Sequence, residues 1–67
     1  MINTYYAITK MGNGNIIIRN FDIFEERGKE AYNKIRDKLY IEDYRIKLVG
    51  LYGRLYYAEK AVENGNF

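Results

Sequence analysis

TYYAITKMGNGNIIIRNF, residues 4–21, contains two runs rich in β-branched and aromatic residues, separated by the loop-forming residues Met11–Gly14. Such runs favour strands, and Asn-Gly supplies the positive φ angles that a tight hairpin loop needs. We therefore predict strands over residues 4–10 and 15–21, joined by the three-residue loop Gly12-Asn13-Gly14.

The length of this loop determines which side chains share a face, because successive residues of a strand point to opposite sides. One face would carry Tyr6, Ile8, Ile16 and Ile18. The opposite face would carry Tyr5, Ala7, Thr9, Ile17, Arg19 and Phe21. The first set is the more apolar, so we predict that it forms the core face.

Residues 22–40 show the pattern of an amphipathic helix. Asp22 is a suitable N-cap, and Glu25 three residues later completes a variant of the capping box. Apolar or small residues recur in steps of three and four, which places them in one stripe: Phe24, Gly28, Ala31, Tyr32, Ile35 and Leu39. We expect this stripe to pack on the sheet, with residues 41–43 as a short connection.

Residues 44–51 (YRIKLVGL) alternate as a third strand, with Ile46 and Leu48 on one side and Arg45 and Lys47 on the other. A turn over residues 52–54 precedes residues 55–61, which suit either a fourth strand or a helix ended by Gly65. The expected fold is a single α+β domain over residues 1–67, a β-β-α-β-β antiparallel sheet with one helix packed on one face. The alternative order is β-β-α-β-α.

Composition argues against catalysis. Eight residues are Tyr, whereas Cys, His, Trp, Pro, Ser and Gln are absent. Without Cys or His there is no disulfide, no ordinary zinc site and no imidazole to activate a nucleophile. The acidic pairs Glu25-Glu26 and Glu42-Asp43 do not have the spacing of a calcium loop. We therefore expect a protein that is not an enzyme and that has no cofactor and no metal site.

The charge balance is weakly basic, with a formal net charge of +2 from 11 basic and 9 acidic residues. Such a balance permits nucleic-acid binding without requiring it, since dedicated binders concentrate basic residues in a stripe. The first residues lack the basic region of a signal peptide, and the longest apolar run, Ile16–Ile18, is far too short to insert into a membrane. We expect a cytoplasmic protein that does not bind membranes.

The abundance of Ile, Asn, Tyr and Lys indicates AT-rich codons and hence a low-GC bacterium, phage or mobile element. In size and style the chain resembles the small accessory proteins of phages and mobile elements, many of which bind and block a host enzyme or defence complex. No motif carries this resemblance. For a phage protein the expected location is the host cytoplasm.

The tyrosines provide the main functional hypothesis. Tyr5-Tyr6 and Tyr56-Tyr57 are adjacent pairs, so in strands each pair would show one ring on each face of the sheet. A face away from the helix that combines aromatic, β-branched and basic residues suits a partner protein or a second copy of the chain. We predict a partner-binding surface made of Tyr5, Ile17, Arg19, Phe21, Arg45, Lys47, Val49 and Tyr56. The leading hypothesis is a protein-binding inhibitor of a host protein that also forms a homodimer. The alternative is a small nucleic-acid-binding regulator that stacks bases on exposed tyrosines.

Overall fold

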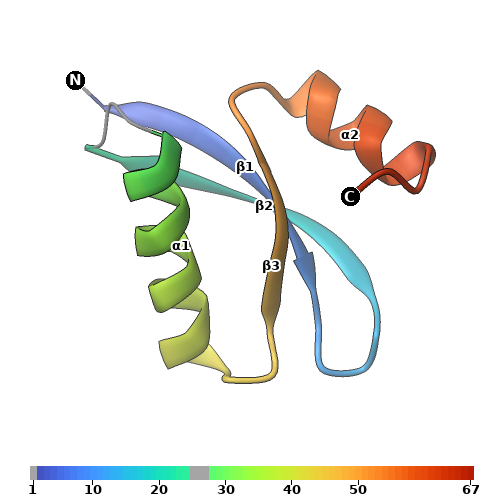
Figure 1. Ribbon diagram of the computed structural model, residues 1–67, viewed down its shortest axis with the longest axis horizontal. Helices are drawn as coiled ribbons and strands as arrows, with labels where there is room; N and C mark the ends of the chain where they lie inside the picture. Colours follow the sequence, from blue (N-terminus) through green and yellow to red (C-terminus); the bar gives the residue numbers. More distant parts are fainter. Residues whose placement is uncertain (1, 25–27) are drawn as a thin grey trace.

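The computed structural model describes residues 2–24 and 28–67, and it combines a three-stranded antiparallel sheet with two helices (Figure 1). The elements are β1 (Asn3–Lys10), β2 (Ile16–Ile23), α1 (Gly28–Glu42), β3 (Lys47–Tyr52) and α2 (Leu55–Glu63). The α+β class is therefore confirmed, but the expected fourth strand is wrong. Residues 55–63 are helical, which is the alternative that the sequence had left open.

The hairpin forms as predicted. Its loop is closed by the Met11 amide, which donates to the Asn15 carbonyl at 2.8 Å, and by the Gly14 amide, which donates to the Met11 carbonyl at 2.9 Å. Gly14 has a φ of 91°, a value that glycine adopts without steric cost. The Asn13 side chain accepts a hydrogen bond from the Asn15 amide and so braces the loop.

Helix α1 begins later than predicted, and Asp22 is not its N-cap. Strand β2 continues to Ile23, with Asp22 opposite Thr4, whose hydroxyl donates to the Asp22 carboxylate at 2.6 Å. Burial of Ile23 beneath α1 favours this extension of the strand over a cap at Asp22. Glu25 and Glu26 lie outside the described residues.

The predicted stripe of α1 is confirmed at its centre, because Ala31, Ile35 and Leu39 are buried. The helix continues through Ile41 and Glu42, which were expected to belong to the connection.

The two helices cover opposite faces of the sheet, which corrects the expectation of one covered face. Helix α1 packs on the face of Ala7 and Ile23, with Tyr5 and Phe21 beside them. The face of Tyr6, Ile8, Ile16 and Ile18 packs instead on Ala58 and Ala61 of α2. The predicted grouping of side chains by face was right, but its assignment to α1 was wrong. Figure 1 shows the two helices on either side of β3.

Small residues explain how both faces can be covered. Ala7 and Ala31 are fully buried on the α1 side, and Ala58 is fully buried on the α2 side. Side chains of this size let the helices approach the sheet closely. Helix α2 ends in a Schellman-type turn, in which Gly65 has a φ of 65° and the Asn66 amide donates to the Ala61 carbonyl.

Strand β1 lies at the centre of the sheet, in the order β2-β1-β3. Strand β3 pairs with β1 from Tyr6↔Tyr52 to Lys10↔Lys47, but the register shifts between Ile8 and Thr9. Val49 is the extra residue at this bulge, and it packs toward α2 while Leu48 packs toward α1. The bulge shifts the alternation of side chains by one residue, so Leu48 and Leu51 both pack on the α1 side, whereas Val49 and Tyr52 both pack on the α2 side.

Candidate functional site

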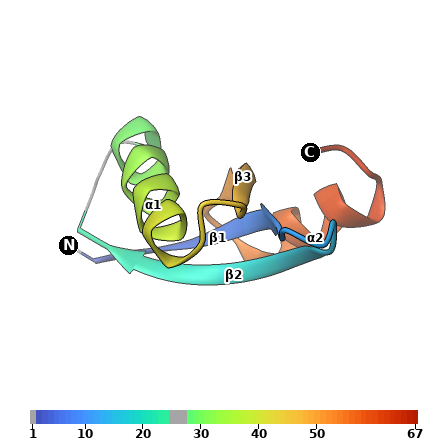
Figure 2. The same ribbon diagram turned by 90° about the horizontal axis from the view of Figure 1, so that it is seen from below.

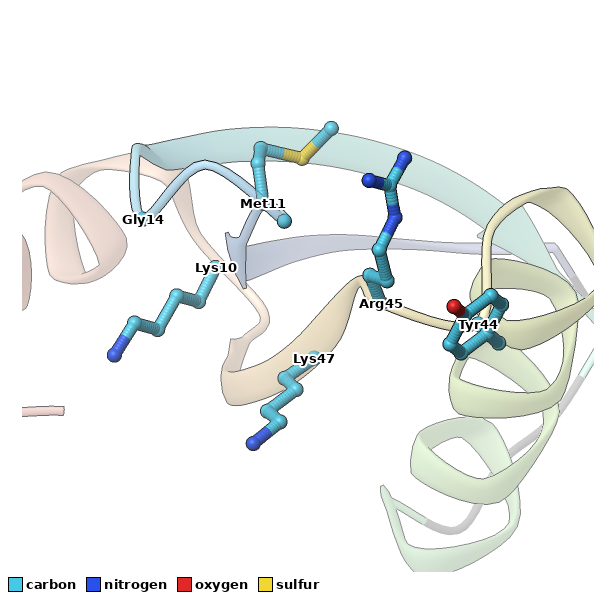
Figure 3. A pocket seen from close by; sticks show the side chains of 7 residues that line it. Lys10, Met11, Gly14, Tyr44, Arg45 and Lys47 are labelled. Atoms are coloured by element: carbon cyan, nitrogen blue, oxygen red, sulfur yellow. The ribbon is translucent and has the colours of Figure 1, made fainter.

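A hollow lined by three basic residues lies at the end of the sheet where the hairpin loop meets the start of β3. It has a volume of about 400 Å³ and is lined by Lys10, Met11, Gly12, Gly14, Tyr44, Arg45 and Lys47 (Figure 3). The first four residues come from the end of β1 and its loop, and the others come from the connection into β3. We call this hollow the basic pocket.

Lys10 and Lys47 occupy directly opposite positions in the β1–β3 pair. Figure 3 shows their side chains extending in the same general direction from the ribbon. Like charges placed directly opposite each other on neighbouring strands are destabilising. Neither lysine forms an ion pair within the described part of the chain. The two ammonium groups are therefore not neutralised by an acidic side chain within the described part of the chain.

Arg45, unlike the two lysines, is held in place by hydrogen bonds to Asp43. Its guanidinium donates from Nε and Nη2 to the Asp43 carboxylate at 3.1 and 3.0 Å, and its backbone amide donates to the same carboxylate at 3.0 Å. These hydrogen bonds hold the pKa of the Asp43 carboxyl below its usual value. The Arg45 stem lies within van der Waals reach of Gly12, where an added Cβ would come 3.2 Å from the Arg45 Cβ. Arg45 is thus a fixed wall of the pocket, whereas the lysines are its free charges.

Tyr44 and Met11 supply the apolar part of the pocket. The Tyr44 side chain is 72% exposed, which leaves much of its ring accessible. Met11 packs partly against the α1-side core, and its sulfur is 3.9 Å from the Thr9 hydroxyl. Figure 3 shows Met11 and the Tyr44 ring on opposite sides of the Arg45 side chain, and the two lysine side chains extending away from Met11. The Tyr44 ring is therefore the accessible apolar group of the pocket.

The predicted partner-binding residues do not form one continuous face. Arg45 and Lys47 line the basic pocket. Ile17, Arg19 and Phe21 lie on the α1-side face of β2, where Arg19 is paired with Glu42 and lies over the Phe21 ring at 5.3 Å. Val49 packs on the opposite side, against the α2 core. Tyr56 lies on α2, and 64% of its surface is exposed.

Tyr5 lines a second hollow of about 430 Å³, together with Gly28, Lys29, Tyr32, Leu51 and Gly53. This hollow lies between the start of α1 and the far end of β1 and β3. It shares none of its lining residues with the basic pocket. The eight predicted residues are thus divided among two hollows, two strands and one helix.

Sequence reasoning missed Lys10, Met11 and Tyr44 as site residues. Lys10 ends a predicted strand and Met11 begins the loop, so each has an ordinary structural role. The site could have been found only from the register of the β1–β3 pair, because that pairing brings Lys10 opposite Lys47. That pairing is between strands separated by a helix, and no local pattern determines it.

Comparison of the chain with known protein families, curated proteins and solved structures found no match. Among the described residues, no helix has the length and apolar character needed to cross a membrane. The same residues contain no group of three metal-binding side chains close enough to hold an ion.

Proposed function

We propose that this chain is a non-enzymatic protein-binding module that holds an acidic segment of a partner protein in the basic pocket. The observation that supports this most directly is the placement of Lys10 directly opposite Lys47 beside a cavity of about 400 Å³. A carboxylate between the two ammonium groups would turn an unfavourable pair of charges into a favourable cluster.

The apolar lining favours a peptide over a simple anion. The exposed Tyr44 ring could accept an apolar side chain of the peptide whose carboxylate the lysines hold. Tyr is a frequent anchor at protein interfaces. The ligand class that fits is a segment with one or two Asp or Glu residues flanking a Leu, Met or Phe.

A small nucleic-acid-binding regulator is the second candidate, and the exposed Tyr44 ring beside three basic residues supports it. A base could stack on Tyr44 while a phosphate occupies the place of the carboxylate. The low net charge of +2 and the acidic residues interspersed over the rest of the surface favour the peptide.

The test is an NMR titration of the labelled protein with two probes, a short acidic peptide containing one Leu and an oligothymidylate of equal charge. The peptide should shift the amide signals of residues 10–14 and 44–47. Lys10→Ala and Lys47→Ala should each weaken binding by roughly fivefold, or about 1 kcal/mol. Lys38→Ala, on the exposed face of α1, is the matched control.

The outcomes separate the candidates. If the oligonucleotide binds more tightly than the peptide, with the same dependence on Lys10 and Lys47, the pocket binds nucleic acid and the second candidate is correct. Binding of neither probe, or equal weakening by Lys38→Ala, would contradict the assignment of the pocket. The partner in this proposal is a bacterial host protein, a hypothesis that rests on the codon composition and small size of the chain.

A further inference from the structure

Strand β2 leaves one long side of the sheet open. It is an edge strand of eight residues, and no strand of the described chain pairs with its outer side. Figure 2 shows β2 along the lower margin of the molecule, with no other ribbon beneath it. The strand contains neither Pro nor a bulge, two features that prevent an edge from pairing, and its two charged residues, Arg19 and Asp22, are partnered by Glu42 and Thr4.

The opposite edge is protected. The Tyr32 hydroxyl of α1 donates to the carbonyl of Leu48 in β3 at 3.1 Å. The register shift beside Ile8 and Thr9 also interrupts the regular repeat of β3. The two edges of this sheet are thus unequal, and only β2 offers a regular ladder of backbone groups.

The hairpin shows which groups of β2 point outward. The Met11 amide bonds to the Asn15 carbonyl, and the Thr9 hydroxyl reaches the Ile17 carbonyl at 2.8 Å, so the odd-numbered residues of β2 direct their backbone groups toward β1. In an antiparallel pair these positions alternate with positions that face away. The outward amides and carbonyls therefore belong to Ile16, Ile18, Asn20 and Asp22.

We propose that β2 pairs antiparallel with β2 of a second copy to give one continuous six-stranded sheet. The two-fold axis that relates the copies passes midway between their two Asn20 residues. A two-fold axis perpendicular to the sheet keeps the α1 side of both copies on the same face of the joined sheet. Opposed residues must then point to the same face, so each allowed register places one residue opposite its own counterpart. Centring on Asn20 places Asn20 opposite its counterpart. The other opposed pairs are Ile18 with Asp22, Arg19 with Phe21 and Ile17 with Ile23.

The side chains of β2 favour a second copy as the partner. Arg19 already lies 5.3 Å from the Phe21 ring of its own strand, and this register places it opposite the Phe21 ring of the other copy as well. Ile17, which is 43% exposed in the single chain, comes beside the Ile23 of the other copy at the edge of the α1-side core. The competing register, centred on Arg19, would oppose two arginines. The register centred on Asn20 is thus favoured over the one centred on Arg19.

Disulfide trapping tests both the partner and the register. The chain has no cysteine, so Asn20→Cys introduces a single thiol. In the proposed dimer the two Cα atoms at position 20 would be about 5.5 Å apart, within the range that a disulfide spans. Under mild oxidation Asn20→Cys should form a covalent dimer at least about tenfold faster than Asn13→Cys, a loop control, because pairing raises the effective thiol concentration.

Sedimentation provides an independent measurement. The parent should show concentration-dependent dimerisation that Asn20→Pro abolishes, because proline removes the outward amide and leaves the β1 ladder intact. Asn20→Ala keeps that amide and should still dimerise. A parent that stays monomeric at high concentration, together with cross-linking of Asn20→Cys no faster than that of Asn13→Cys, would overturn the proposal. That result would leave the edge to a strand of another protein.

Discussion

Asp43 connects the end of α1 to the segment before β3 through hydrogen bonds to Leu39, Arg45 and Ile46. Its carboxylate accepts from the Arg45 amide and from two guanidinium nitrogens, and its amide donates to the Leu39 carbonyl of α1. The side-chain hydrogen bond from Arg45 is the largest cause of the lowered Asp43 pKa. One residue thus sets the angle at which the chain leaves the helix and presents Tyr44 to the basic pocket.

This interaction predicts a pH dependence of stability. Because the pKa of Asp43 in the folded protein lies below its ordinary value of 3.8, the ionised carboxylate stabilises the fold at neutral pH. That contribution should fall as the pH drops below about 4 and vanish below the lowered pKa. Asp43→Asn should therefore be less stable than the parent at pH 7, and the difference should disappear in acid. Urea unfolding across this pH range, with Asp37→Asn as control, measures it; a constant difference would contradict the assignment.

Gly14 is the other residue whose local conformation determines structure. Its positive φ closes the hairpin, and no atom lies within 4 Å of an added Cβ, so the cost of a substitution there is purely conformational. Gly14→Ala should destabilise the fold by roughly 1–2 kcal/mol. Gly53→Ala, also in open space but without a positive φ, is the matched control. Equal effects of the two substitutions on the urea midpoint would show that the loop conformation is not a constraint.

The helices and strands show that each face of the sheet has its own cover. Ile8 is fully buried beneath Ala58 and Ala61 of α2, whereas Ala7, its neighbour in β1, is buried beneath α1. Three layers in a chain of this length require a helix on each side of one narrow sheet. Helix α2 is therefore a core element, although it has only nine residues.

Truncation of Ile8 tests the role of α2. Ile8→Ala truncates the largest fully buried side chain of the α2-side core and should cost about 2–4 kcal/mol, a large part of the stability of so small a domain. Ile41→Ala, at a position 84% exposed on α1, should change stability by less than about 0.5 kcal/mol. Circular dichroism during thermal unfolding compares the two. A small effect at Ile8 would show that α2 does not hold the sheet.

Local patterns explain what could be predicted. The Asn13-Gly14 signal gave the hairpin and its register, and the spacing of Ala31, Ile35 and Leu39 gave the buried side of α1. The face of Tyr6 and Ile8 was expected to pack on α1, whereas α2 covers it. Side-chain parity shows which residues share a face but not which element covers that face. Asp22 has the chemistry of an N-cap, but its hydrogen bond to Thr4 and the burial of Ile23 keep it in β2. The Lys10–Lys47 pair depends on the long-range register of β3, which no segment encodes by itself.

The whole molecule presents two separate surfaces for other molecules, the basic pocket at the hairpin end and the open edge of β2. A dimer through β2 would leave the pocket of each copy open, because Lys10 and Lys47 lie in the β1–β3 pair on the other side of β1. Two pockets related by a two-fold axis would bind a partner with two sites more tightly than one pocket. The proposed dimer and the proposed ligand site are thus compatible with each other.

The opposed lysines predict that stability and binding change in opposite directions. Lys47→Glu replaces a repulsion across the strands by an attraction, so it should raise the free energy of unfolding by roughly 0.2–1 kcal/mol at low salt, and less at high salt. The same change places a negative charge in the proposed anion site and should abolish binding of the acidic peptide. Lys38→Glu, on exposed α1, should do neither. Urea unfolding and peptide titration of the same samples measure both effects. A Lys47→Glu variant that is stabilised yet still binds the peptide would show that the lysine pair does not hold the ligand. A variant that gains stability and loses binding would show that the two lysines serve binding at a cost to the stability of the fold.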